Sequence, residues 1–129
     1  PMPARILIVD DEKQLTQFLG EVLLLEVPDA TVDVAHSGEE ALSCLAGATY
    51  DVIFADLRMP GVDGMELIRG LRYLDADVPV ILMTGYGTPQ LEEQARLLGV
   101  SHYLDKPFDA VQIADLLAQI LPSGMLPNG

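Results

Sequence analysis

Residues 50–64 of the chain read YDVIFADLRMPGVDG, and they contain the strand around which the rest of the sequence is organised. The apolar run 52–55 is typical of a parallel strand that is buried on both faces. It stops at Asp56, and Pro60 and Gly64 then prevent a regular continuation. Open α/β sheets bind ligands beyond the carboxyl ends of their strands. Asp56 is therefore either a ligand-binding carboxylate or only the first residue of a turn.

Length and composition indicate one folded domain with an acidic surface. Half of the 129 residues are hydrophobic, and 20 acidic against seven basic residues give a formal charge of −13. This charge would repel nucleic acid and anionic membranes, so we expect neither as a direct partner. A single cysteine, Cys44, excludes an internal disulfide and fits a reducing compartment. We find no signal-peptide pattern and no apolar run long enough to span a bilayer, which predicts a cytoplasmic protein.

Strand-like and helix-like segments alternate along the chain. Strands are expected at 5–9, 31–35, 52–55, 78–83 and 100–104. Ser37, Thr88 and Asp109 have the residue types and positions of helix N-caps. Apolar residues at helical spacing are expected to face the core: Leu15, Phe18, Leu19 and Val22; Ala41 and Leu45; Met65, Leu67, Ile68, Leu71 and Leu74; and Ile113, Leu116, Leu117 and Ile120.

Five strand–helix alternations predict an α/β fold, a doubly wound (βα)5 arrangement. We expect a five-stranded parallel sheet with helices on both faces. The strand order 2-1-3-4-5 is taken from known sheets of this type. The domain is expected to span residues 5–121. Residues 1–4 would form an N-terminal extension, and residues 122–129 a flexible tail or linker.

Chemically active side chains follow the strands of this sheet. Asp10 and Asp11 end the first strand, Asp56 the third and Thr84 the fourth, and Lys106 follows the fifth. At an effective dielectric of about 20, two carboxylates about 4 Å apart repel by roughly 4 kcal/mol. One lysine cannot offset three of them, so the group suits a hard divalent cation. The absence of clustered histidines disfavours Zn²⁺, and the oxygen ligands favour Mg²⁺, with Mn²⁺ as a substitute.

A cation, an ammonium group and a hydroxyl beside a carboxylate form a site suited to phosphoryl transfer. The cation and Lys106 would neutralise the phosphoryl oxygens while Thr84 donates a hydrogen bond. The carboxylate would be the nucleophile and would form an acyl phosphate. The residues alone do not decide which carboxylate attacks. Asp56 is favoured because it ends the central strand.

With these residues in these positions, the sequence resembles the receiver domains of two-component response regulators, which have a flavodoxin-like fold. The resemblance covers residues 5–121. It is carried by Asp10-Asp11, Asp56 with Met59-Pro60 and Gly64, Thr84-Gly85, Tyr103, and Lys106-Pro107-Phe108. Each pair alone is weak evidence of kinship, whereas the complete set is specific to this family.

The resemblance implies a role for each acidic residue. Asp56 would be the phosphoacceptor and would bind Mg²⁺ directly together with Asp11. Asp10 would bind the ion largely through water, and the backbone carbonyl of Arg58 would be a further ligand. Arg58 and Tyr86 would tune hydrolysis, because the second residues after the acceptor and after the switch threonine vary in the family.

The resemblance also implies a conformational switch. Lys106 would pair with the phosphoryl group, and its peptide bond to Pro107 would be cis. Thr84 and Tyr103 would form the switch pair, the hydroxyl moving toward the phosphoryl group and the ring turning inward. A surface formed by residues 88–98, 101–104 and 111–121 would then change its affinity for an output domain or a second copy.

The implied function is that of a signalling domain that catalyses only its own phosphorylation and dephosphorylation. The phosphoryl donor would be a histidine kinase or a phosphotransfer protein. A haloacid-dehalogenase-like phosphatase is the alternative, but it requires Asp-x-Asp where this chain has Asp10-Asp11-Glu12. A flavodoxin-like binder is disfavoured because three acids would repel a flavin phosphate. The sequence leaves open whether the chain is a stand-alone receiver, a phosphate shuttle or part of a longer regulator.

Overall fold

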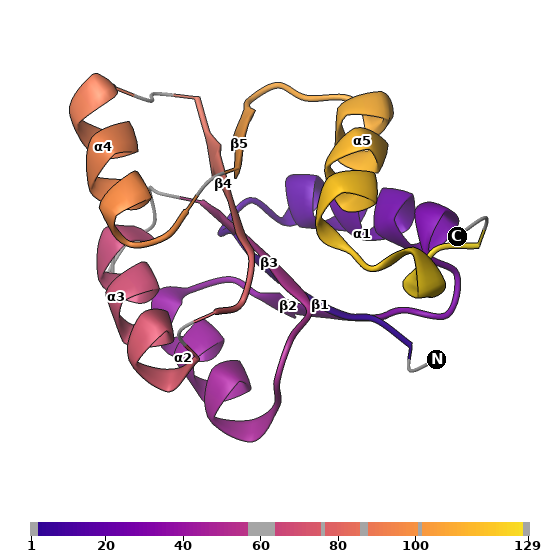
Figure 1. Ribbon diagram of the computed structural model, residues 1–129, viewed down its shortest axis with the longest axis horizontal. Helices are drawn as coiled ribbons and strands as arrows, with labels where there is room; N and C mark the ends of the chain where they lie inside the picture. Colours follow the sequence, from indigo (N-terminus) through magenta and orange to yellow (C-terminus); the bar gives the residue numbers. More distant parts are fainter. Residues whose placement is uncertain (1–2, 57–63, 76, 86–87, 101, 128–129) are drawn as a thin grey trace.

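The described part of the chain alternates five times between strand and helix (Figure 1). The computed structural model describes residues 3–56, 64–75, 77–85, 88–100 and 102–127. The elements are β1 (Arg5–Val9), α1 (Lys13–Glu26), β2 (Thr31–Ala35), α2 (Gly38–Gly47), β3 (Val52–Asp56), α3 (Gly64–Leu74), β4 (Val80–Thr84), α4 (Pro89–Leu97), β5 (His102–Asp105), α5 (Ala110–Ile120) and the 3-10 helix η1 (Ser123–Met125). No helix among these residues combines the length and apolarity needed to cross a bilayer.

The sheet has the predicted strand order. Its five strands are parallel and lie in the order β2-β1-β3-β4-β5. In the β1–β3 pair Val9 lies opposite Ala55, and in the β4–β5 pair Thr84 lies opposite Asp105. Because all strands run in one direction, their carboxyl ends meet at a single edge. β1 and β3 are neighbours there, which brings the residues that follow them together.

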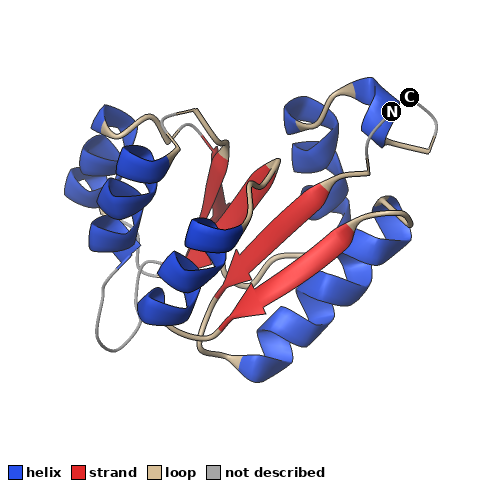
Figure 2. Ribbon diagram, turned by 90° about the horizontal axis from the view of Figure 1, so that it is seen from below, coloured by secondary structure: helices blue, strands red, loops and turns tan. Residues whose placement is uncertain are grey.

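Both faces of the sheet are covered, as predicted (Figures 1 and 2). Leu7 and Val9 belong to a core cluster with α2, α3 and α4, whereas Ile6 and Ile8 belong to a second cluster with α1 and α5. Successive residues of a strand point to opposite faces, so each central strand serves both clusters. This double burial explains why β1, β3 and β4 are almost entirely apolar until their carboxyl ends.

The helix N-caps are also confirmed. The side chains of Ser37, Thr88 and Asp109 each accept a hydrogen bond from the backbone N–H three residues later. These bonds satisfy N–H groups that have no partner inside the helix. The local sequence therefore fixes where α2, α4 and α5 begin, and with them the path by which the chain leaves β2, β4 and β5.

Two predicted core positions are wrong. Phe18 is 41% exposed and Leu74 is 52% exposed. In α1 the buried residues are Thr16, Leu19, Val22 and Leu23. Phe18 lies about 100° around the helix from Leu19, at the margin of the packed face. Leu74 is the last residue of α3, so no following turn covers it.

The segment after α5 also differs in part from the expected flexible tail. η1 forms there, and Met125 and Leu126 pack against the core cluster on the α1 and α5 face of the sheet. Pro122, Ser123 and Gly124 have the composition of a linker, which concealed the two apolar residues that follow. Those two side chains gain burial by folding back onto the sheet.

Arg72 joins three elements on the other face. Its Nε donates a hydrogen bond to the carbonyl of Leu98 at 2.7 Å, and its Nη1 donates to Val78 at 2.7 Å. A longer bond of 3.4 Å reaches the carbonyl of Gly99, which has a positive φ of 84°. The last carbonyls of a helix lack internal donors and carry partial negative charge. Arg72 therefore caps the end of α4 from α3 and ties both to the start of β4.

A second polar cluster joins the amino-terminal parts of three strands. The hydroxyl of Tyr50 donates to Asp33 at 2.7 Å, and the guanidinium of Arg5 pairs with the same carboxylate at 2.9 Å. The hydrogen bond from Tyr50 is the main cause that lowers the pKa of Asp33, and Arg5 adds to it. A lowered pKa means that the carboxylate form of Asp33 stabilises the folded state.

We expect Arg72→Met to lower the free energy of unfolding by about 2 kcal/mol, because it leaves the partly buried carbonyls of Leu98 and Val78 without their Arg72 donor. Urea denaturation at neutral pH measures the change. Arg69→Met is the matched control, since Arg69 lies on the same helix and is exposed. Equal unfolding free energies for the two variants would show that the Arg72 contacts contribute nothing.

We expect Tyr50→Phe to cost about 1 kcal/mol at pH 7 and clearly less below about pH 4. The stabilisation by ionised Asp33 is complete above its unfolded pKa and is lost as the pH falls through its lowered folded pKa. The difference between wild type and variant should therefore shrink on acidification. Urea titrations at pH 7 and below about pH 4 measure this difference in unfolding free energy. Tyr73→Phe is the control, because Tyr73 is 91% exposed.

Candidate functional site

Three carboxylates meet at the carboxyl edge of the sheet. Asp10 directly follows β1, and its N–H donates to the carbonyl of Ala35 at 3.1 Å. Asp56 is the last residue of β3. Asp10, Asp11 and Asp56 each place a carboxylate oxygen within 4.8 Å of the other two. Asp10 is fully buried and Asp56 is 6% exposed, whereas Asp11 is exposed. The predicted convergence of β1 and β3 thus has a direct chemical consequence.

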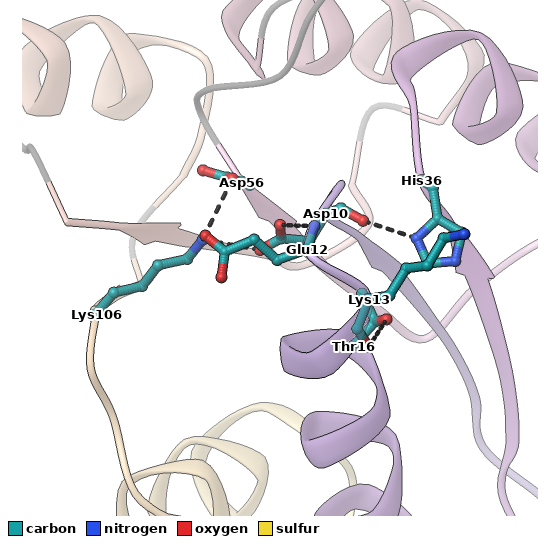
Figure 3. A network of polar contacts seen from close by, with 7 residues as sticks. All are labelled: Asp10, Glu12, Lys13, Thr16, His36, Asp56 and Lys106. Carbon is teal, nitrogen blue, oxygen red and sulfur yellow. Dashed lines mark hydrogen bonds and ion pairs between the residues drawn. The ribbon is translucent and has the colours of Figure 1, made fainter.

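Lys106 joins this acidic group from the far side (Figure 3). Its Nζ lies 2.9 Å from Oδ2 of Asp10 and 3.3 Å from Oδ2 of Asp56. Its backbone N–H donates to the carbonyl of Thr84 at 2.9 Å, which holds the residue beside the end of β4. The Lys106–Pro107 peptide bond is cis, as the resemblance implied. The structure therefore brings together Asp10, Asp56, Thr84 and Lys106 from four strand ends.

Burial and charge act against each other in this group. Burial raises the pKa of Asp10, although the N–H of Glu12 and the ammonium of Lys106 oppose this rise. Burial lowers the pKa of Lys106, but the hydrogen bond and charge of Asp10, with those of Asp56, outweigh it and raise that pKa. Lys106 thus stays protonated at neutral pH. Lys106 carries one positive charge, whereas Asp10, Asp11 and Asp56 would carry three negative charges when ionised. The described residues of this group therefore have an excess of negative charge.

The donor set fits a magnesium ion. Mg²⁺ prefers carboxylate and water oxygens at about 2.1 Å, so opposite ligands lie about 4.2 Å apart. The oxygens of Asp10, Asp11 and Asp56 lie within 4.8 Å of one another, close to that spacing. The predicted fourth ligand, the backbone carbonyl of Arg58, lies outside the described residues. The arrangement is an acidic triad suited to a hard divalent cation.

A pocket of about 440 Å³ opens beside Asp56. It is lined by Glu12, Leu15, Asp56, Thr84, Gly85, Lys106 and Pro107. Thr84, the last residue of β4, is 6% exposed. Two carboxylates, one ammonium group and one hydroxyl therefore border the same small opening. Asp10 does not line it.

The remaining predicted residues lie elsewhere or outside the described parts. The hydroxyl of Tyr103 is 3.1 Å from the carbonyl of Glu92 and 3.4 Å from that of Val100, so the ring is directed toward α4. Tyr86, like Arg58, lies outside the described residues. Of the predicted switch pair, Thr84 thus lies at the site, whereas Tyr103 lies against α4.

Two further residues touch the site. Nδ1 of His36 lies 3.0 Å from the backbone carbonyl of Asp10 (Figure 3), a contact that was not predicted from the sequence. Its position just after β2, next to β1 in the sheet, is the signal that could have placed it here. Glu12 lies with one carboxylate oxygen 3.7 Å from Nζ of Lys106.

Comparisons with known proteins agree with this geometry. Residues 6–118 match the response regulator receiver domain. The chain is 40% identical over 118 residues to the C4-dicarboxylate transport transcriptional regulatory protein DctD of Pseudomonas aeruginosa, covering 91% of this chain and 25% of that protein. It is 32% identical over 121 residues to sporulation initiation phosphotransferase F of Bacillus subtilis, covering 94% of this chain and 96% of that protein.

A solved structure gives the same result. Vibrio cholerae chemotaxis protein CheY4 superposes with a TM-score of 0.85 at 27% identity, covering 93% of this chain and all of that one. The family match covers most of the chain, which excludes the phosphatase and flavin-binding alternatives. The chain belongs to the response regulator receiver domains, the phosphoaccepting domains of two-component signal transduction, and is a signalling domain rather than an enzyme.

Proposed function

We propose that Asp56 accepts a phosphoryl group from the phosphohistidine of a histidine kinase or a phosphotransfer protein. The observation that carries the proposal is the position of Lys106, whose ammonium lies between the carboxylates of Asp10 and Asp56 at the wall of the pocket. One oxygen of Asp56 would attack phosphorus as the bond to the histidine nitrogen breaks. The product would be an acyl phosphate.

The surroundings of the acids favour Asp56 as the nucleophile. Both oxygens of Asp10 are already engaged, one by the N–H of Glu12 at 2.9 Å and the other by Lys106. Asp10 is also fully buried and does not line the pocket. Asp11 is exposed, and the ion pairs of Lys106 within the described residues are with Asp10, Glu12 and Asp56. Of the three aspartates, only Asp56 both lines the pocket and contacts Lys106 among the described residues.

Asp10, Asp11 and Asp56 would hold Mg²⁺, or Mn²⁺ in its place, with the Arg58 carbonyl as a further ligand. When bound, the ion supplies positive charge that offsets the charge of the phosphoryl oxygens. The ammonium of Lys106 would move its ion pair from Asp56 to one phosphoryl oxygen. The hydroxyl of Thr84 would donate a hydrogen bond to a second phosphoryl oxygen. Asp10 would keep Lys106 in place meanwhile, because it is the nearer partner.

We further propose that Thr84 and Tyr103 couple this site to a surface formed by α4, β5 and α5. Tyr103 already links β5 to α4 through the carbonyl of Glu92. Phosphorylation adds close to two negative charges at the end of β3, and movement of Thr84 toward them would change the contacts of α4. The surface would then bind an output domain or a second copy of the chain.

Its relatives suggest two kinds of protein in which this domain could act. The chain spans a quarter of DctD but nearly all of sporulation initiation phosphotransferase F. A longer transcriptional regulator and a phosphoryl shuttle are thus both represented among its relatives. We propose a cytoplasmic receiver domain of residues 5–121, against whose core Met125 and Leu126 also pack.

Asp56→Asn should abolish phosphorylation by acetyl phosphate in the presence of Mg²⁺, because the amide cannot form the acyl phosphate. Intact-mass measurement detects the added phosphoryl group on the wild-type chain, and a chelator should prevent its addition. Asp51→Asn is the matched control, since Asp51 lies just before β3 at the opposite end of the same strand. Equal labelling of Asp56→Asn and the wild type would exclude Asp56 as the acceptor.

Arg58→Ala and Tyr86→Ala should each shorten the lifetime of the phosphorylated protein several-fold. Both residues are large, and Arg58 carries a charge that could pair with the phosphoryl group and exclude water. The rate at which the phosphorylated mass disappears after donor removal measures the effect. Half-lives equal to that of the wild type would dispose of this role for the two residues.

A further inference from the structure

Glu12 stands at the start of α1, but its side chain does not serve the helix. It occupies the N-cap position with an extended backbone (φ −82°, ψ 105°), and its side chain makes no capping hydrogen bond. One carboxylate oxygen instead lies 3.7 Å from Nζ of Lys106, and the residue lines the pocket beside Asp56 and Thr84 (Figure 3). The side chain is directed to the phosphoryl-transfer site and not to the helix.

Of the three acids around Lys106, Glu12 is the one most easily displaced. Asp10 and Asp56 approach the ammonium more closely, at 2.9 and 3.3 Å, and their side chains are 0% and 8% exposed. The side chain of Glu12 is 63% exposed. It therefore lies at the rim of the pocket, whereas Asp56 lines the pocket from a buried position. A phosphoryl donor that enters must take over part of the contact between Glu12 and Lys106.

We propose that Glu12 is an electrostatic gate that selects against small anionic phosphodonors. A free phosphodonor carries its negative charge past this carboxylate and is repelled, whereas a protein donor can present a basic side chain to Glu12 as it docks. Glu12 thus determines specificity without being the nucleophile or a proposed metal ligand. This inference rests on the proposed function, since it requires that Asp56 accepts the phosphoryl group.

The expected effect follows from Coulomb's law. A carboxylate about 6 Å from a phosphoryl dianion, partly screened by water and salt, slows its entry by roughly fivefold. The penalty grows with the charge of the donor, so a monoanion should suffer less than a dianion. It should also shrink as ionic strength rises, because Glu12 is exposed and salt screens exposed charges.

The test compares Glu12→Gln with the wild type in the rate of Asp56 phosphorylation. Acetyl phosphate serves as the dianionic donor and phosphoramidate as the less charged donor, both at saturating Mg²⁺ so that ion affinity does not limit the rate. Glu12→Gln should react roughly fivefold faster with acetyl phosphate at low salt. The gain should be smaller with phosphoramidate, and smaller with either donor at high salt.

Two further variants make the result specific. Glu12→Asp keeps the charge at the rim and should keep most of the penalty. Glu21→Gln removes the same charge from the same helix about 13 Å along its axis, and it should react like the wild type. Because the Glu12 side chain caps nothing, Glu12→Gln should fold normally, and thermal unfolding checks this.

Unchanged or slower reaction of Glu12→Gln with acetyl phosphate would overturn the gate, as would an equal gain with both donors at every ionic strength. Failure of the proposed function has a different signature. In that case the wild-type chain itself would acquire no phosphoryl group on Asp56 from either donor.

Discussion

The ion pairs of Lys106 with Asp10 and Asp56 are the interaction on which the site depends. They join residues 96 and 50 positions apart in the sequence. A carboxylate buried as completely as Asp10 is costly unless its charge is compensated. Lys106 supplies that compensation together with the N–H of Glu12. These contacts hold the carboxyl ends of β1 and β3 and the segment after β5 in a fixed arrangement.

The compensation is incomplete, and this incompleteness matters for function. Within the described residues, the ammonium of Lys106 pairs with two of the three clustered aspartates. The cluster of Asp10, Asp11 and Asp56 therefore keeps an excess of negative charge there. A divalent cation bound there would relieve this repulsion. The ammonium contacts both Asp10 and Asp56, so in the proposed reaction it would pass from Asp56 to a phosphoryl oxygen and keep its contact with Asp10. The same charges therefore position the reacting groups and leave room for the reaction.

The rest of the fold distributes rigidity unevenly around this site. β1, β3 and β4 are buried on both faces and provide a fixed base. α4 buries only Ala95 completely among its described residues, and it is held largely by polar ties from Arg72 and Tyr103. Helices with little buried apolar surface rearrange at low free-energy cost. Such a helix next to the carboxyl end of β4 is suited to report a change of charge at Asp56.

The helices and strands, and the residues that gather at the site, could be predicted from the sequence alone. The apolar runs ending in Asp10, Asp56 and Thr84 predicted buried parallel strands, and the caps at Ser37 and Thr88 predicted helix starts. These signals are local, since strand burial and helix capping depend on residues a few positions apart.

The contacts between distant segments could be seen only in the folded structure. It directed the side chain of Glu12 to Lys106, left Phe18 exposed, joined Arg72 to the end of α4 and packed Met125 against the core. Each of these outcomes depends on which surface another element presents across a gap of many residues. Sequence spacing carries no such information, because the angle at which helices pack onto a sheet is set by the whole core at once.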